Sequence, residues 1–420
     1  MSVVSEAQAS QAESVPPPVE KQSGALKRFG FRLLFAYVLF YLLPPFMPGS
    51  WDWLVTWAGQ DVFHTEVATE FTSSGDTSYQ YVLEACRAAL ALATALIWTP
   101  FDRGRKADVR LGEWLRVAVR FALAMQMLVY GIMKVVPTQF STPGLMALAE
   151  PLGSHSPMGL LWAFMGTSTV YTIFAGFVEV MGGLLLLSRR TTLLGALVSI
   201  VAMGNVVALN FCYDVPVKLF SSHLLLLAAL LTAPDVGRLA DIFLLNRPVL
   251  PAVLRPHSVR RWVNWTLLGV KTLAFTALIG STILGDINTR KSFASAAPKP
   301  PLYGIWNADE PAQTGLPEAD RWRQVAVEFP GIIGVTTADG TFQYYRASVD
   351  QAHQTWTLTS NRRKGWSSRL TYTQIRPGQI MLRGTFGSHL LQATLTQMPD
   401  TRPPLLSRGF HWISPVPFNR

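Results

Sequence analysis

The stretch Ser168–Leu187 (STVYTIFAGFVEVMGGLLLL) decides the fold class, because it is apolar over a length that can cross a bilayer as a helix. Glu179 stands near its middle. A carboxylate at that depth costs roughly 3 kcal/mol to insert, so it normally faces a protein interior and has a partner. We therefore expect a helical membrane protein with a buried polar centre at Glu179.

Further segments approach the roughly 20 apolar residues that a transmembrane helix needs. With Ser168–Leu187 they predict about seven transmembrane helices, of which the first and sixth are short. The other segments are Phe31–Phe46, Tyr79–Trp98, Trp114–Val136, Thr191–Cys212, Val217–Thr232 and Val263–Ile287. Two shorter apolar pieces, Trp51–Phe63 and Met158–Phe164, contain tryptophan and are expected to form interfacial or re-entrant helices.

The distribution of basic residues predicts the orientation. No Lys or Arg occurs between Leu33 and Ala85 or between Val135 and Ser188, whereas arginines and lysines crowd the intervening loops. By the positive-inside rule, this alternation places the N-terminus in the cytoplasm and the C-terminal part outside it. The net charge of +10 is thereby accounted for. No basic helix, RRM or zinc-finger pattern accompanies it, so nucleic acid is not an expected partner.

The composition changes after residue 290. We expect a disordered tail over residues 1–26, a linker over 291–320 and an antiparallel all-β domain over 321–420. The stretches Arg323–Phe329 and Thr341–Val349 are expected to flank a hairpin turn at Asp339-Gly340. Further strands are expected at Thr355–Thr359, Leu370–Ile375, Gln379–Phe386 and Leu390–Thr396, giving a meander, a sandwich or a small barrel. The aromatic and basic tail after them, including Phe410-His411-Trp412, is expected to dock on the barrel or the membrane face.

Polar residues gather in the outer half of the predicted bundle. Candidate ligand-binding residues are Tyr130, Lys134, Glu179, Asn205, Asn210, Asp214, Lys218 and His223. Tyr130 and Lys134 share a helix face, and Lys134 is the natural partner of Glu179, with Lys218 or His223 next. Glu179, Lys134 and His223 are the candidate catalytic groups. The seven histidines and two cysteines show no metal-ligand spacing, so no metal is expected.

A structural role for the same residues is the alternative. Amides and hydroxyls often only join helices, and lysines often reach for the membrane surface. Asp214, just before Pro216, is suited to cap the following helix. Gly176, Gly182 and Gly183 around Glu179 favour close helix packing over ligand contact.

Three stretches resemble the DoxX-like membrane protein family: YGIMKVVPTQF (130–140), FAGFVEVMGGLLLLSRRT (174–191) and NFCYDVPVKLFSSHLLLLA (210–228). The resemblance covers a four-helix core of about residues 114–235. It implies a bacterial inner-membrane protein, with some relatives tied to thiosulfate–quinone oxidoreduction or oxidative-stress complexes. Lys134 and Glu179 occupy the family-pattern positions. The three extra helices and the β domain depart from that pattern.

Three functions follow as hypotheses. The first is a redox-linked membrane component with a quinone or small sulfur substrate at Lys134 and Glu179. No haem-ligand pair, flavin motif or CxxC is present, so a partner would supply any electron carrier other than quinone. The second is a protein that binds or transports a lipid or small molecule. The third is a scaffold or assembly factor that recruits a protein partner through its β domain. Whether the protein is an enzyme stays open.

Overall fold

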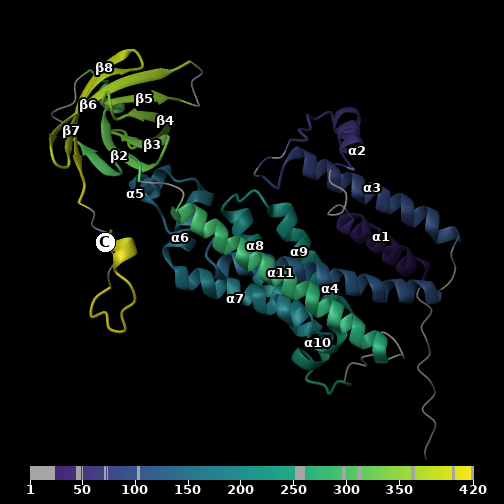
Figure 1. Ribbon diagram of the computed structural model, residues 1–420. Helices are drawn as coiled ribbons and strands as arrows, with labels where there is room; N and C mark the ends of the chain where they lie inside the picture. The colour runs from purple at the N-terminus through teal and green to yellow at the C-terminus, as the bar shows by residue number, and fades with distance from the viewer. Residues whose placement is uncertain are drawn as a thin grey trace, which may run out of the picture. The chain divides into compact units, whose positions relative to one another are not determined.

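The computed structural model describes residues 24–43, 49, 51–70, 72, 74–101, 105–250, 261–295, 299–309, 315–360, 365–399 and 403–417 (Figure 1). It divides into two compact units, residues 1–119 and 120–420, and each is described by itself. Most of the expected disordered tail lies outside the described residues, although α1 already begins at Ala25.

The first unit is built from a helix pair and a short helical segment. α1 (Ala25–Leu42) packs against α3 (Ser78–Phe101), and α4 (Arg105–Val135) begins in this unit and continues into the second. Between α1 and α3, α2 (Asp52–Trp57) continues as one π-helical turn, η2 (Ala58–Val62). The short helix predicted over Trp51–Phe63 is therefore present.

The second unit contains the remaining helices. After α4 come α5 (Leu145–Ala149), the 3₁₀ turn η3 (Leu152–Ser154), α6 (Pro157–Thr167), α7 (Thr169–Leu186) and α8 (Thr192–Cys212). They are followed by α9 (Lys218–Thr232), the 3₁₀ turn η4 (Ala233–Asp235), α10 (Val236–Phe243) and α11 (Arg261–Ser295). Ser168 separates α6 from α7, because its side-chain oxygen accepts a hydrogen bond from the backbone N–H of Tyr171 and starts a new helix.

Within the described residues, six helical stretches are long and apolar enough to cross a membrane. They are Ser78–Phe101, Asp108–Val135, Thr169–Leu186, Thr192–Cys212, Lys218–Phe243 and Gly269–Thr289. The protein is thus a multi-pass helical membrane protein, as predicted. The predicted first span is the exception: α1 carries Lys27, Arg28 and Arg32 within its 18 residues, too many charges for a typical span. Residues 44–46 of that prediction lie outside the described part.

The C-terminal part of the chain is a closed eight-stranded antiparallel barrel (Figure 1). Its strands follow one another around the barrel in chain order: β1 (Gly304–Ala308), β2 (Trp322–Phe329), β3 (Ile332–Thr337), β4 (Phe342–Asp350), β5 (Thr355–Thr359), β6 (Ser367–Arg376), β7 (Gln379–Phe386) and β8 (His389–Gln397). The first and last strands pair, with Trp306 opposite Gln397, and this closes the barrel. The expected all-β domain is confirmed as a barrel rather than a sandwich.

Two strands correct the sequence prediction. The Asp339-Gly340 turn joins β3 to β4, whereas the predicted partner strand is β2, which pairs with β1 and β3. β3 was not predicted, because five of its six residues are buried. Its sequence therefore lacks the alternation of apolar and polar residues that marks a half-exposed strand. β1 lies inside the expected linker 291–320, and α11 extends to Ser295, so the linker is shorter than predicted.

Side chains fill the interior of the barrel. Trp322, Trp356 and Leu358 are among its fully buried residues, and they belong to one continuous apolar core. An eight-stranded barrel encloses a space just wide enough for side chains or one small ligand. In this barrel, side chains occupy that space.

Most of the described residues beyond the barrel are exposed. α12 (Pro404–Ser407) is a single turn, and the ring of Phe410 packs on that of Trp412 with centroids 5.0 Å apart. Trp412 itself is 91% exposed, so the expected docking of this tail on the barrel is not seen. The end of the predicted tail, Phe418–Arg420, lies outside the described residues.

Candidate functional site

The site around Glu179 is built on a very close crossing of α4 and α7. A Cβ added to Gly176 would lie 2.6 Å from the carbonyl oxygen of Gly131 and 2.9 Å from the backbone nitrogen of Val135. A Cβ on Gly131 would in turn lie 2.8 Å from the backbone nitrogen of Val180. Only glycine allows two helix backbones to approach this closely. The predicted packing role of Gly176 is therefore confirmed.

Lys134 and Glu179 meet directly beside this crossing. The ammonium nitrogen Nζ of Lys134 lies 2.8 Å from Oε2 of Glu179, and the two side chains are only 8% and 3% exposed. Removing both charges from water is costly, and their mutual attraction offsets that cost only at close range. The predicted partner of Glu179 is correct, and its carboxylate faces the protein interior as expected.

Further along α7, other glycines allow this helix to pack closely against α4 and α8. A Cβ on Gly183 would lie 2.8 Å from Cγ of Leu128 on α4. A Cβ on Gly182 would lie 3.1 Å from Oγ of Ser199 on α8, and one on Gly195 would lie 2.8 Å from the backbone nitrogen of Leu186. α7 is thus held between two neighbours, which limits the movement of Glu179.

Two other predicted site residues join neighbouring helices, and a third, His223, bonds within its own helix. Nδ2 of Asn210 on α8 donates to Oγ of Ser221 on α9, at 3.0 Å. The ring of Tyr130 packs on that of Phe220, with centroids 5.6 Å apart. Nδ1 of His223 lies 2.7 Å from the carbonyl oxygen of Leu219, within its own helix. These contacts match the structural alternative for Asn210 and Tyr130.

The remaining predicted residues lie at exposed positions or pair with each other. Lys218 and Asp214 form an i,i+4 ion pair at 2.7 Å, in which the Asp214 side chain is exposed. Asp214 does not cap α9, because the residue at the cap position is Val217 and no side chain bonds there. Asn205 is exposed on α8. Among the predicted site residues that the structure describes, Lys134 and Glu179 form the buried charged centre.

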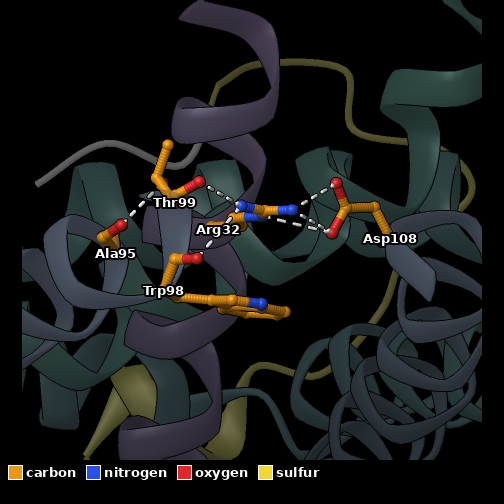
Figure 2. A network of polar contacts seen from close by, with 5 residues as sticks. All are labelled: Arg32, Ala95, Trp98, Thr99 and Asp108. Carbon is orange, nitrogen blue, oxygen red and sulfur yellow. Dashed lines mark hydrogen bonds and ion pairs between the residues drawn. The ribbon is translucent and has the colours of Figure 1, made fainter. Parts of the chain in front are cut away.

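A second buried ion pair, which sequence reasoning missed, fastens α1 in the first unit. Figure 2 shows the guanidinium of Arg32 between Asp108 and the end of α3. Nη2 of Arg32 donates to both carboxylate oxygens of Asp108, at 3.2 and 3.1 Å, and Nη1 donates to the carbonyl oxygens of Trp98 and Thr99. The guanidinium carbon also lies 5.0 Å from the ring centroid of Trp98. Arg32 therefore joins three helices, a role that no local pattern signals.

Polar side chains also meet between α1 and α3. The Tyr37 hydroxyl donates to Oε2 of Glu84 at 3.0 Å, and Glu84 pairs with Arg87, three residues further along α3. The guanidinium of Arg87 lies 5.4 Å from the ring centroid of Tyr41. Beside them runs an open groove of about 390 Å³, lined by Gly30, Leu33, Leu34, Tyr37, Ala88, Ala91 and Leu92.

The barrel is attached to the segment between α4 and α7. The backbone N–H of Met146 on α5 donates to Oε2 of Glu328, and the Thr336 hydroxyl donates to the carbonyl oxygen of Ala149. The Ser154 hydroxyl donates to the carbonyl oxygen of Gly340. Met146 and Ala149 form an apolar cluster with barrel residues Ala326 and Phe342. Because α5 covers the outer face of β2 and β3, most of β3 and the middle of β2, residues 325–327, are buried on both sides.

Electrostatics at this junction favour a protonated tyrosine. Burial, followed by the nearby carboxylates of Glu150 and Glu328, raises the pKa of Tyr344 above its ordinary value. A Cβ on Gly144 would overlap the carboxylate of Glu328, so a larger residue at this position would displace that side chain. In the described part of the chain, no three His, Cys, Asp or Glu residues gather in a way that would hold a metal ion.

Comparison with known proteins gives one informative match. No protein-family model matches the chain, and no solved structure matches it. The chain is 36% identical over 144 residues to the uncharacterized protein YwoB of Bacillus subtilis (strain 168), an alignment that covers 34% of this chain and 90% of YwoB. The chain belongs to the YwoB family. YwoB is much the shorter protein, so the present chain carries a large additional part. The name of YwoB states no activity.

Proposed function

We propose that this protein is a DoxX-like membrane component that holds its barrel beside the membrane as a binding module for a partner protein. The observation that carries the proposal is the filled barrel interior, with Trp322, Trp356 and Leu358 at its centre. A barrel whose interior is occupied by packed side chains is expected to act through its outer surface. The family resemblance of the 130–140, 174–191 and 210–228 stretches supports the DoxX-like part of the proposal.

The attachment of the barrel supports a presenting role. Three hydrogen bonds and an apolar cluster hold it on the α5–η3 segment, so it is not free to tumble on its linker. That segment joins α4 to α7, the two helices that carry Lys134 and Glu179. A rigid bundle therefore fixes the position of the module.

The exposed tail supplies a contact surface of defined chemistry. Phe410, Trp412 and Ile413 are exposed, and aromatic side chains dominate the energetics of protein interfaces. No acidic residue follows Asp400, whereas Arg408 and two further arginines do. The partner expected for such a tail has an apolar groove bordered by acidic side chains.

Site-specific photocrosslinking in the native membrane tests this proposal. A benzoylphenylalanine in place of Trp412 is expected to give a discrete protein adduct that is weakened by Arg408→Glu. The same crosslinker at His353, exposed on the barrel, is the matched control and is expected to give none. The proposal fails if the two positions give the same products, or if Trp412 yields adducts with lipid only.

The orientation is part of the same proposal: a bacterial inner membrane, with the N-terminus in the cytoplasm and the barrel outside. The absence of Lys and Arg between Val135 and Ser188, followed at once by Arg189-Arg190, supports it. With the exposed Cys212 replaced by serine, an impermeant maleimide is expected to label His353→Cys in spheroplasts. Arg190→Cys is expected to react only after lysis, and the reverse pattern contradicts the orientation.

A second candidate function is a proton-linked redox step at the membrane ion pair. The buried contact between Lys134 and Glu179 favours it, because intramembrane ionisable pairs often serve proton paths. A quinone or small sulfur compound is the corresponding substrate class. In membranes supplied with such a substrate, Glu179→Gln is expected to abolish quinone reduction, while the exposed control Glu113→Gln leaves the rate unchanged. An unchanged rate in Glu179→Gln removes this candidate.

A further inference from the structure

Three basic side chains converge at the C-terminal end of α7, in a part of the second unit that the proposed functions do not use. Nζ of Lys271 on α11 donates to the carbonyl oxygen of Leu187, the residue directly after α7, at 2.9 Å. Leu187 is followed two residues later by Arg189, in the turn before α8. Lys271 thus satisfies a carbonyl group that has no partner within its own helix.

Arg120 reaches the same place from α4. Its guanidinium lies 4.5 Å from the ring centroid of Phe121, and that ring packs on Phe275, one turn beyond Lys271 on α11, with centroids 5.7 Å apart. Arg120 and Arg189 both act on Lys271 electrostatically, and both repel its ammonium group. Arg120 is buried, and Arg189 and Lys271 are half-buried. Positive charge from three separate segments is therefore concentrated where water is partly excluded.

The surroundings are those of a lipid headgroup region. Trp262 and Trp265, at the start of α11, are exposed, as tryptophans at a membrane–water interface are. Leu184, Leu194 and Leu273 are exposed apolar residues on the three elements beside the cluster. An acyl chain can lie along these leucines while its headgroup meets the basic side chains.

We propose that Arg120, Arg189 and Lys271 form a binding site for the phosphate group of an anionic phospholipid. Basic pockets between transmembrane helices bind such headgroups, and a phosphate would neutralise the mutual repulsion of the three cations. The leucines beside the cluster favour a phosphate carried by a lipid over free inorganic phosphate. The site is independent of Glu179 and of the barrel.

Lipid-dependent unfolding of the purified full-length chain in detergent tests this site. Phosphatidylglycerol is expected to raise the unfolding temperature of the wild type, whereas phosphatidylcholine and inorganic phosphate at equal concentrations are not. Arg189→Gln is expected to weaken the affinity for phosphatidylglycerol about fivefold, as loss of one basic residue near a lipid surface implies. Lys271→Met is expected to act similarly, and Lys271→Arg is expected to retain binding.

The matched control is Arg190→Gln, which removes the same charge from the exposed neighbouring position. It is expected to bind phosphatidylglycerol like the wild type. Equal losses in Arg189→Gln and Arg190→Gln would reduce the effect to general surface charge and overturn the site. Equal stabilisation of the wild type by inorganic phosphate would overturn its assignment to a lipid. No stabilisation by phosphatidylglycerol would overturn the proposal altogether.

Discussion

Gly131 and Gly176 bring the backbones of α4 and α7 into contact, and each stands three residues before one member of the buried ion pair. A Cβ on Gly176 would lie only 2.6 Å from the carbonyl oxygen of Gly131. Residues three apart lie on the same side of a helix, so Lys134 and Glu179 project from the two contacting faces. The glycine contact therefore sets the distance over which the charges meet, 2.8 Å.

The first prediction concerns this glycine contact. Gly176→Ala is expected to destabilise the protein by ~1–3 kcal/mol, because its methyl group would overlap backbone atoms that cannot rotate away. Gly204→Ala on α8 is the control, since a Cβ there meets nothing within 4 Å. The helix propensity of alanine should make that change neutral or slightly favourable. Unfolding of the two variants in detergent measures the difference; equal stability would show that the helices can separate at no cost.

The second prediction concerns the buried charges. Glu179→Gln and Lys134→Met are each expected to cost about 3–5 kcal/mol, because each leaves one charge buried without a partner. The double variant is expected to lose much less than the sum of the two. The exposed pair of Asp214 and Lys218 is the control, for which a coupling free energy below about 1 kcal/mol is expected. Strict additivity at Lys134 and Glu179 in a double-mutant cycle would argue against the ion pair.

The third prediction concerns the junction of α1, α3 and α4 in the first unit. Arg32→Lys keeps the positive charge but loses the planar group that reaches Asp108 and the carbonyls of Trp98 and Thr99 together. We expect a loss of ~1.5–3 kcal/mol in the free energy of unfolding. Lys27→Arg, an exposed change on the same helix, should shift it by less than about 0.5 kcal/mol. If Arg32→Lys had the same free energy of unfolding as the wild type, a positive charge alone would be enough to hold the three helices together at this position.

The fourth prediction concerns the attachment of the barrel to α5. Thr336→Val preserves the shape of the side chain but removes the donor to the carbonyl oxygen of Ala149. The cost is expected to be about 1–3 kcal/mol, felt locally as faster amide hydrogen exchange over Leu145–Ser154. Thr371→Val, at an exposed position of β6, is the matched control and should leave that exchange unchanged. Unchanged exchange in both variants would show that the apolar cluster alone holds the barrel.

Local patterns in the sequence predicted most of the secondary structure. The long apolar runs and the alternating residues of Gln379–Phe386 depend only on near neighbours, so both were correctly assigned. β3 was missed because α5, a distant segment, covers its outer face. Both faces of the strand are therefore buried, and its residues do not alternate between apolar and polar. The contact of Arg32 with Asp108 was missed because 76 residues separate them and the sequence does not indicate which distant charges meet.

By itself, the sequence determined that this is a multi-pass helical membrane protein with a β domain, and that Glu179 needs a partner inside the bundle. Those conclusions follow from the cost of placing polar groups in hydrocarbon, which depends on composition and length alone. Tertiary structure decided that the first of the candidate partners, Lys134, is the one that Glu179 meets, that β1 and β8 close the barrel, and that α5 holds it. These are contacts between segments far apart in the chain, and packing geometry rather than local composition selects them.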